Sequence, residues 1–298
     1  MTASERVVRR IVGAKRMKRA ALLSGAVDEF ASAYVGGKST VETVSTARRL
    51  RSFGLLTGFA YLPSDDHAES LDRLTELMGA LGDLARSSEF NVKRLTLGHG
   101  ASARAKLREL CTAADELGAT VTLEMGGFAH YAETLRLWRE VREDHPGLGI
   151  TLPAEIRRAE ADCRELAADS ARIRLCVGAY PVPRHEGIRR EHDKTRALVR
   201  CLRTTMEVGG YAMLASHHPT VVAIAQDLAY RNGIGQDGFE FQMFHGIRPL
   251  EQRRLVDIGY RARTYVPYGP GWFEYLTTQV AVRPRTAYSY LQAVMDKR

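Results

Sequence analysis

The chain has 298 residues, of which 45% are hydrophobic and 26% are charged. This composition is ordinary for a soluble globular protein, and it excludes a disordered chain, a collagen and a small disulfide scaffold. No apolar run approaches the roughly 20 residues that a membrane span needs, and no signal peptide is visible, so we expect a cytoplasmic protein. The four cysteines, Cys111, Cys163, Cys176 and Cys201, form no C-x-x-C pair, which predicts buried reduced thiols.

The net charge of +8 is concentrated at the start of the chain. Residues 1–19 hold seven Lys or Arg side chains against Glu5 alone, so they carry +6 of the total. A nucleic-acid surface would spread basic residues over the fold and place aromatic residues among them, so we expect no nucleic-acid partner. Apolar positions at Val8, Ile11 and Val12 predict an amphipathic basic helix. Such a helix presents either a solvated surface or a peripheral contact with a membrane or a partner.

From residue 54 onward, short β-like runs alternate with segments of helical periodicity. The starts of eight such runs lie 25–38 residues apart, which leaves room for one strand, one helix and two loops in each unit. The predicted strands are 54–62, 89–97, 120–125, 148–152, 173–180, 211–217, 239–244 and 264–269. The predicted helices between them include 68–81, 103–117, 132–142 and 192–207. Eight units of this kind predict an α/β fold closed into one (β/α)8 TIM-type barrel.

No linker divides the chain, so residues 1–298 are predicted to form a single domain. Residues 1–50 would form an N-terminal helical segment, and 54–298 the barrel with a C-terminal helix. The alternative is an open doubly wound sheet, whose signature is G-x-G-x-x-G between a strand and the following helix. Gly233 to Gly238 has this spacing, but it precedes the strand at 239–244 instead of following one. We interpret it as a turn.

Polar residues gather where the predicted strands end. In a barrel enzyme the C-terminal ends of the strands form the active-site rim, so these positions favour a ligand site. They are Lys93, Glu124, Arg174, Gly178, Ser216, His217, Gln242, Tyr265 and Tyr268. The adjacent pair His217-His218 is poorly spaced for chelation and has no accompanying H-x-H or H-E-x-x-H, so we expect no metal. No G-x-S-x-G motif is present, which disfavours nucleophilic hydrolysis and leaves cofactor or small-ligand chemistry.

Several strings in the second half of the chain occur in the order found in one known family. They are Arg174-Leu-Cys-Val-Gly-Ala-Tyr180, Ala215-Ser-His-His-Pro219, Phe239-Glu-Phe-Gln-Met-Phe-His-Gly246, Tyr265-Val-Pro-Tyr-Gly269 and Trp272 with Tyr275-Leu276. Together they resemble the proline dehydrogenase family. The resemblance implies a distorted (β/α)8 barrel that holds FAD noncovalently at the strand ends. It also implies that the flavin takes a hydride from the carbon beside the amine nitrogen of proline.

The resemblance also implies roles for individual residues. Arg174 matches the arginine that contacts the flavin, where a guanidinium stabilises negative charge on the reduced ring. The positions implied at the cofactor are Met125, Arg174, Val177, Gly178, Ala179, Ser216, His217 and Gln242. Those implied at the substrate are Lys93, Glu124, Phe244, Tyr265, Tyr275, Thr278 and Gln279. Glu124 stands where the family has an aspartate, and Glu124 and Arg174 are the predicted catalytic pair.

The sequence departs from the family pattern at both halves of the site. The family reads Tyr-Leu-x-Arg-Arg where this chain has Tyr275, Leu276, Thr277, Thr278 and Gln279, so the two arginines that hold the proline carboxylate are absent. A charge-assisted bond of this kind contributes roughly 1.5–3 kcal/mol, which predicts a substrate other than free L-proline. At the cofactor, Pro153 replaces a glutamine and Val177 a lysine.

Three hypotheses follow. The first is an FAD-dependent oxidoreductase that takes a hydride from a C–N or N–N bond of an amine or amino-acid-derived substrate, with a quinone, oxygen or a partner protein as acceptor. The second is a genuine proline dehydrogenase in which Arg94, Arg283 or Arg285 supplies the missing positive charge. The third is a non-catalytic binding or regulatory barrel.

Overall fold

The computed structural model of this chain describes residues 33–64 and 69–276. Its strands are β1 (Leu56–Tyr61), β2 (Glu89–Lys93), β3 (Thr120–Glu124), β4 (Gly149–Pro153), β5 (Arg172–Cys176), β6 (Tyr211–Ala215), β7 (Glu240–Phe244) and β8 (Arg261–Tyr268). Its α-helices are α4 (Thr40–Ser52), α5 (Ser70–Leu81), α6 (Gly100–Glu116), α7 (Tyr131–Arg142), α8 (Ala159–Ala168), α9 (Glu191–Val208), α10 (Pro219–Arg231) and α11 (Pro249–Asp257). Three 3-10 helices are η1 (Gly82–Ala85), η2 (Arg94–Leu97) and η3 (Phe128–His130).

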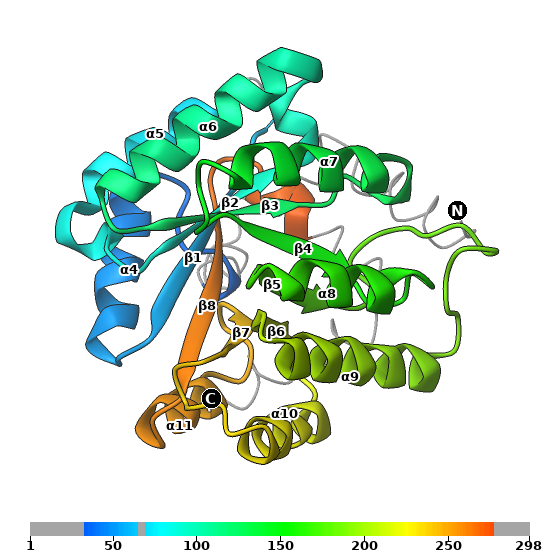
Figure 1. Cartoon of the computed structure of the whole chain (residues 1–298). Coiled ribbons are helices and arrows are strands. Elements are labelled where there is room, and N and C mark those ends of the chain that lie inside the picture. The colour runs from blue at the N-terminus through cyan, green and yellow to red at the C-terminus, as the bar shows by residue number, and fades with distance from the viewer. Residues whose placement is uncertain (1–32, 65–68, 277–298) are drawn as a thin grey trace.

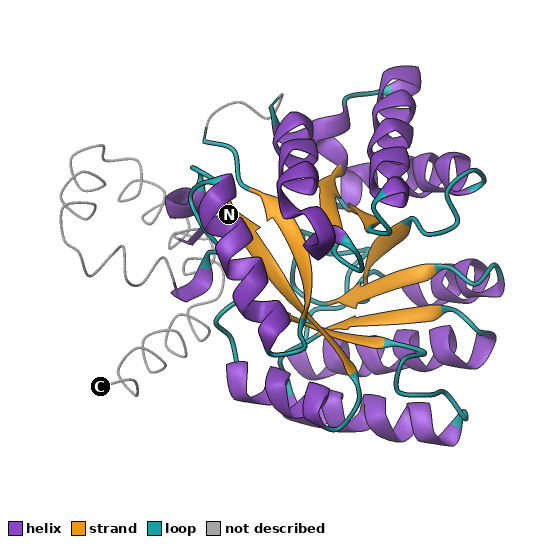
Figure 2. Ribbon diagram, turned by 90° about the vertical axis from the view of Figure 1, so that its left-hand side faces the viewer, coloured by secondary structure: helices purple, strands orange, loops and turns teal. Residues whose placement is uncertain are grey.

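The eight strands form a closed parallel barrel in sequential order, with helices around it (Figures 1 and 2). The closing pair is β1 with β8, in register from Leu56 opposite Arg263 to Tyr61 opposite Tyr268. The predicted (β/α)8 barrel is therefore confirmed. The G-x-G-x-x-G string is a turn between α10 and β7, also as predicted.

The apolar core lies between the barrel and its helices. In β2, Phe90 and Val92 are buried, and the Phe90 ring packs 5.8 Å from that of Phe59 in β1. In α5, Leu74, Leu77, Met78 and Leu81 are buried at the i, i+3, i+4, i+7 spacing of one helical face. Alternation in the strands and helical periodicity around them therefore direct apolar side chains to the same layer. All four cysteines are buried and free, as expected.

Three predicted strands have an end that is wrong by three residues or more, and a positive-φ glycine follows the true end of two of them. The second strand was predicted to reach Leu97, but β2 ends at Lys93 and η2 leads into Gly98 at φ 80°. The fifth was predicted to reach Tyr180, but β5 ends at Cys176, because Gly178 at φ 67° turns the chain out of the sheet. β8 starts at Arg261, three residues before the predicted start.

Helix α4 lies within the predicted N-terminal helical segment. Its N-cap Ser39 accepts a hydrogen bond from the Glu42 N–H, and the Lys38 N–H donates to the Glu42 carboxylate. The two bonds satisfy backbone donors that a helix start otherwise leaves unpaired. The predicted basic helix within 1–19 lies outside the described residues, and of the predicted C-terminal helix the structure describes residues 272–276, which are helical.

Candidate active site

The interior of the barrel is filled by polar and charged side chains. One face of each strand points inward, and at least nine inward residues are polar and buried. They are Glu89, Asn91, Thr122, Glu124, Thr151, Arg174, Glu240, Gln242 and Arg263. A barrel interior is usually filled by branched apolar side chains, so a polar interior of this extent marks a site or a network that must be fully satisfied.

Arg174, from β5, lies at the centre of this interior. Its guanidinium donates to the carboxylates of Glu89 and Glu124, to the side-chain oxygen of Asn91 and to Gln242 Oε1, the last at 2.6 Å. Burial acts to lower the pKa of Arg174, but the two carboxylates outweigh it and raise the pKa. The guanidinium is therefore permanently charged and held in one orientation, and the carboxylates that pair with it, Glu89 and Glu124, are buried as well.

Glu124 and Tyr265 meet Arg174 at the C-terminal side of the barrel. The Tyr265 hydroxyl donates to Glu124 Oε1 at 2.9 Å, and Arg174 Nη1 donates to the same oxygen at 3.2 Å. The Arg174 guanidinium also lies 5.6 Å from the centre of the Tyr265 ring. Burial, and then the Glu124 charge, raise the pKa of Tyr265, so its hydroxyl remains a proton donor at neutral pH. The three residues form one cluster, and the sequence had singled out all three.

A second layer of charge lies beneath this cluster. Arg263 from β8 donates to both carboxylate oxygens of Glu240 from β7, at 2.7 and 3.0 Å, and to the backbone carbonyl of Thr57 at 2.8 Å. Burial acts to raise the pKa of Glu240, but Arg263 outweighs it and lowers the pKa to about 2. Gln242 joins the layers, because its amide donates to Glu240 at 2.5 Å while its oxygen accepts from Arg174.

The loop after β5 is held by a residue that the sequence interpretation had not chosen. The buried Glu155, in the loop after β4, accepts a hydrogen bond from the Gly178 N–H at 2.7 Å. Pro153 ends β4 opposite Cys176, Val177 is half-buried against the core, and Ala179 is exposed. Gly178 and Ala179 therefore present backbone at the rim, where a planar ligand could approach closely.

Residues after β6 and β7 form a second wall of the rim. His217 Nε2 accepts from the Phe244 N–H at 3.0 Å, and the two rings stack with centroids 5.4 Å apart. Phe244 in turn meets the Tyr265 ring edge-on at 5.2 Å. Ser216 accepts from the His218 N–H at 3.3 Å, which shapes the turn into α10. The predicted residues of strands 6, 7 and 8 are thus brought together.

The remaining predicted residues are placed as follows. Lys93 is half-buried at the end of β2 and opposite Glu124 in register, but no ion pair joins them in the described residues, where Glu124 pairs with Arg174 instead. Met125 is buried directly after β3. Tyr275 is half-buried next to the small cluster formed by Tyr34, Val35, Leu62, Trp272 and Leu276. Thr278 and Gln279 lie outside the described residues.

Several buried partners of Arg174 and Gln242 were not predicted from the sequence. Glu89, Asn91 and Glu240 were not predicted to matter, although each alternates with apolar residues along its strand, and neither was Arg263, which pairs with Glu240. Glu89-Phe-Asn-Val-Lys93 in β2 is a clear case. A period of two with charges on the inner face is the signal that could have found them.

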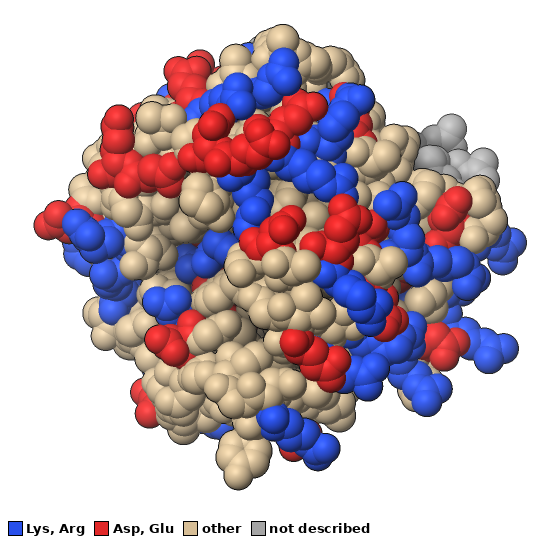
Figure 3. Space-filling view, in the orientation of Figure 1, with Lys and Arg blue, Asp and Glu red and all other residues tan. Residues whose placement is uncertain are grey.

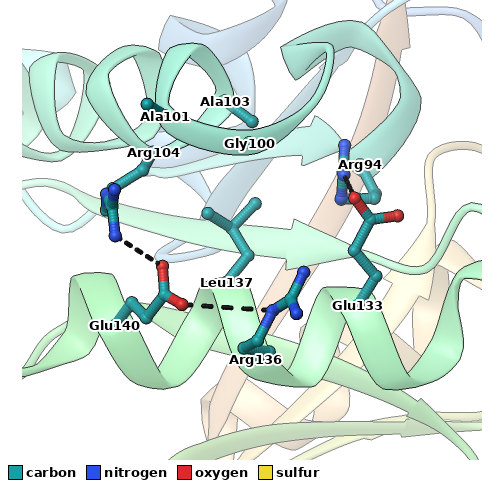
Figure 4. Close-up of a pocket in the computed structure, with 9 residues that line it drawn as sticks. All are labelled: Arg94, Gly100, Ala101, Ala103, Arg104, Glu133, Arg136, Leu137 and Glu140. Carbon is teal, nitrogen blue, oxygen red and sulfur yellow. Dashed lines mark hydrogen bonds and ion pairs between the residues drawn. The ribbon is translucent and has the colours of Figure 1, made fainter.

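A separate hollow of about 180 Å³ lies between α6 and α7 (Figure 4). The buried Arg94 pairs with Glu133 across it, and Arg104 pairs with Glu140 at 3.0 Å. Arg136 approaches the other Glu140 oxygen at 4.0 Å. Both acidic side chains that line the hollow thus form ion pairs with arginines, so we interpret it as an ion-pair region on the surface of the two helices. In the described residues no cluster of His, Cys, Asp or Glu could hold a metal ion, and no helix is long and apolar enough to span a membrane.

Comparison with known proteins shows what the chain resembles. A family model described as Proline dehydrogenase matches residues 190–276, which span α9 to β8 and the following turn. Proline dehydrogenase 1 of Bacillus subtilis (strain 168) is 29% identical over 272 residues, covering 89% of this chain and 90% of the relative. Over most of its length, the chain is therefore similar to proline dehydrogenases. Proline dehydrogenase 2 of the same strain is 26% identical, covering 84% of this chain and 85% of that relative.

Solved structures share the barrel fold of this chain. Proline utilization A (PutA) from Bdellovibrio bacteriovorus, inactivated by N-propargylglycine, superposes with a TM-score of 0.77 at 20% identity. The match covers 91% of this chain and 36% of the PutA chain. PutA from Corynebacterium freiburgense gives a TM-score of 0.68 at 14% identity. This chain therefore spans about a third of the length of these PutA chains, and they establish its barrel fold.

Members of the family generally use FAD, and the donor set of this barrel fits a flavin. The fit rests on a fixed buried cation at Arg174, on backbone at positive φ at Gly178, and on the stacked His217 and Phe244 rings at the rim. Of the hydrogen bonds of Arg174, the one to Thr151 is the longest at 3.5 Å, so this N–H has the weakest protein acceptor.

Proposed function

We propose that this protein is an FAD-dependent proline dehydrogenase. In the reaction, proline loses a hydride from the carbon beside its ring nitrogen and a proton from that nitrogen, which leaves a cyclic imine. When bound, FAD supplies the hydride acceptor. The observation that carries the proposal is the buried cluster of Arg174, Glu124 and Tyr265 at the strand ends of a barrel in this family.

Free proline is the substrate that the comparisons favour, since the curated relatives are named proline dehydrogenases. The expectation of a substrate other than free proline came from Thr278 and Gln279, which replace an arginine pair. No comparison supports that expectation, and it is replaced here by proline. The sequence contains other cations that could meet a carboxylate, and Lys93 is the one at the end of a described barrel strand.

Each residue of the cluster has a distinct proposed task. The Glu124 carboxylate attracts and orients the substrate nitrogen, and the Tyr265 hydroxyl keeps that carboxylate aimed at the rim. Arg174 would hold the flavin and stabilise the negative charge that develops on it, because a preorganised cation in a buried site costs no reorganisation during the reaction. Met125, Val177, Gly178, Ala179, Ser216, His217 and Gln242 are proposed to form the cofactor cradle.

Phe244, Tyr265 and Tyr275 would wall the substrate, with Lys93 beside them. Phe244 and Tyr265 are already in contact, with ring centroids 5.2 Å apart. Such an aromatic wall excludes water from the carbon that gives up the hydride, which strengthens the interactions of Glu124 and Arg174.

Anaerobic titration of the FAD-saturated protein with L-proline tests this function. We expect the visible absorption bands of oxidised flavin to bleach, and the bleaching rate of Glu124→Gln to fall by roughly a hundredfold or more, since the variant loses the charge that orients the amine. Glu140→Gln, in the ion-pair region between α6 and α7, is the matched control and should bleach like the wild type. Absence of bleaching at saturating proline, with flavin bound, would overturn the proposal. Bleaching by pyrrolidine but not by proline would do the same.

A further inference from the structure

A cavity of about 450 Å³ lies on the outer side of the barrel, beside the start of α9. Six arginines line it, and we call it the arginine pocket: Arg157, Arg184, Arg189, Arg190, Arg196 and Arg200. Asp193 is the one acidic residue among its lining residues. In Figure 3, blue side chains gather at the right-hand edge, over the end of α9 where the loop from β5 enters in Figure 1.

Backbone hydrogen bonds hold together the two loops that form the pocket. Ile156 and Gly187 form an antiparallel bridge that ties the loop after β4 to the loop after β5. The Ile188 N–H donates to the Glu155 carbonyl at 2.8 Å, and the Arg157 N–H donates to the Glu186 carbonyl at 3.0 Å. Arg157 therefore faces the arginines of the other loop although it comes from a different β/α unit. The cavity is built by backbone hydrogen bonds, which distinguishes it from a chance crowding of surface side chains.

Half of the arginines are held in place and half are not. The side chains of Arg157 and Arg189 donate to the carbonyls of His185 and Val182, at 3.2 and 2.9 Å, and Arg200 pairs with Glu160 at 3.0 Å. The remaining three have no side-chain hydrogen bond or ion pair with any residue that the structure describes: Arg184, Arg190 and Arg196. This differs from the hollow between α6 and α7, where acidic residues meet the arginines.

Unneutralised arginines that converge on one cavity are electrostatically unfavourable unless an anion binds among them. The guanidinium fork matches phosphate oxygens in pairs, and several forks suit adjacent phosphates better than one carboxylate. Arg190 is also the N-cap residue of the 18-residue helix α9, whose positive end adds to the attraction for an anion. The volume falls within the range of roughly 300–1,000 Å³ usual for small-molecule sites.

We propose that the arginine pocket binds a diphosphate group. Two sources share this chemistry, namely the diphosphate bridge of FAD itself and a separate nucleoside diphosphate. Glu155 connects the pocket to the rim, because its backbone carbonyl holds Ile188 in the pocket wall while its side chain holds Gly178. The pocket wall and the rim are thus held by the same residue, and for the FAD source the inference rests on the proposed function.

Calorimetric titration of the full-length protein with ADP, AMP and inorganic diphosphate tests the proposal. It is carried out at low and at moderate salt, on protein freed of flavin and on FAD-saturated protein. The test variant is the double substitution Arg190→Gln with Arg196→Gln. The matched control is Arg48→Gln with Arg49→Gln on α4, two exposed arginines that also have no ion pair in the described part of the chain.

We expect flavin-free wild type to bind ADP and inorganic diphosphate more tightly than AMP, with affinity falling as salt rises. The test variant should bind ADP at least about tenfold more weakly, since it loses two phosphate contacts, whereas the control should match wild type. If FAD abolishes ADP binding, the source is the cofactor's own diphosphate. If ADP still binds the FAD-saturated protein, the ligand is a separate nucleotide.

Absence of binding of both ADP and diphosphate to the flavin-free protein would overturn the proposal. An equal loss of affinity in the test and control variants would overturn it too, because the effect would then be one of net charge alone. A titration with FAD in the same series keeps this result apart from the proposed function. A protein that takes up no flavin but binds ADP through Arg190 and Arg196 retains the diphosphate site and loses only the dehydrogenase assignment.

Discussion

The barrel interior and the arginine pocket place arginines in opposite circumstances. Inside the barrel, Arg174 and Arg263 are buried, and each is matched by carboxylates within hydrogen-bond distance. In the pocket, Arg184, Arg190 and Arg196 are exposed and have no acidic partner in the described residues. An unpaired charge in the interior destabilises the fold because it has lost its hydration. An exposed charge stays hydrated, so it needs no partner within the protein and is free to bind a ligand. The arginines inside the barrel therefore stabilise the fold, and we assign those of the pocket to ligand binding.

The largest effect is expected from breaking a buried pair in the interior. Arg263→Met leaves Glu240 without its counter-ion and should lower the free energy of unfolding by roughly 3–5 kcal/mol. Urea denaturation followed by circular dichroism measures this loss. The double variant Arg263→Met with Glu240→Met should recover much of it, because no uncompensated charge remains. Equal destabilisation in the single and double variants would contradict the assigned role of the pair.

A smaller effect is expected at the rim of the interior. Tyr265→Phe removes the hydroxyl that donates to Glu124 at 2.9 Å, but leaves the Arg174 contact to that carboxylate. We expect unfolding to become easier by roughly 1.5–3 kcal/mol, the usual contribution of a hydrogen bond to a charged group. Differential scanning calorimetry measures it, and Tyr260→Phe, on the helix side of β7 and β8, is the control. An unchanged melting temperature would show that Glu124 needs no donor besides Arg174.

The buried groups also predict a dependence on alkaline pH that the pocket arginines do not share. Burial raises the pKa of Cys111 to about 12, and burial together with Glu69 raises that of Tyr61 to about 12. The native state therefore binds more protons than the unfolded state once the pH exceeds the ordinary values of these groups. Their stabilising contribution is complete below about pH 9 and is lost as the pH rises towards 12.

Urea midpoints measured between pH 8 and 11 should accordingly decrease. Cys111→Ala should flatten the first part of this decrease, because it removes one of the thiols, which titrate before the tyrosines in the unfolded chain. A midpoint that stays constant over this range would refute the expected linkage.

The smallest effect on stability is expected in the pocket. Replacing Arg190 and Arg196 together by Gln should change the free energy of unfolding of the ligand-free protein by no more than about 0.5 kcal/mol. The change should favour the folded state at low salt, since like charges are removed, and it should vanish at high salt. Denaturation at two ionic strengths measures it. A large destabilisation would mean that these arginines support the fold, which would erase the contrast with the interior.

Much of the barrel could be predicted because strands and helices leave local periodic patterns. All eight strands were placed, and Glu124, Arg174 and Tyr265, which were singled out because they fall at strand ends, lie in contact in the structure. The ends of β2 and β5 were missed, since Gly98 and Gly178 adopt positive φ in turns whose geometry depends on the neighbouring loops. The ion pair between Glu240 and Arg263 was not predicted, because residues on neighbouring strands come into contact only in the folded barrel.

The arginine pocket shows the same limit more sharply. Arg184, Arg189 and Arg190 are close in the sequence, but they resemble an ordinary solvated segment there. Only the bridge between Ile156 and Gly187 brings Arg157 opposite them and makes a cavity. A concave site formed by two loops cannot be derived from the spacing of either one.

The pairing of β1 with β8 has a consequence for how the protein is made. The two strands are separated by roughly 200 residues, so closure is a late, long-range event during folding. Two backbone hydrogen bonds, from the Gly36 N–H to the Pro267 carbonyl and from the Gly269 N–H to the Gly37 carbonyl, add to the contact where β1 meets β8. While the chain is being synthesised, the edge of β1 therefore lacks its partner until β8 leaves the ribosome. During that interval, the unpaired edge of β1 exposes backbone N–H and C=O groups that could pair with another chain.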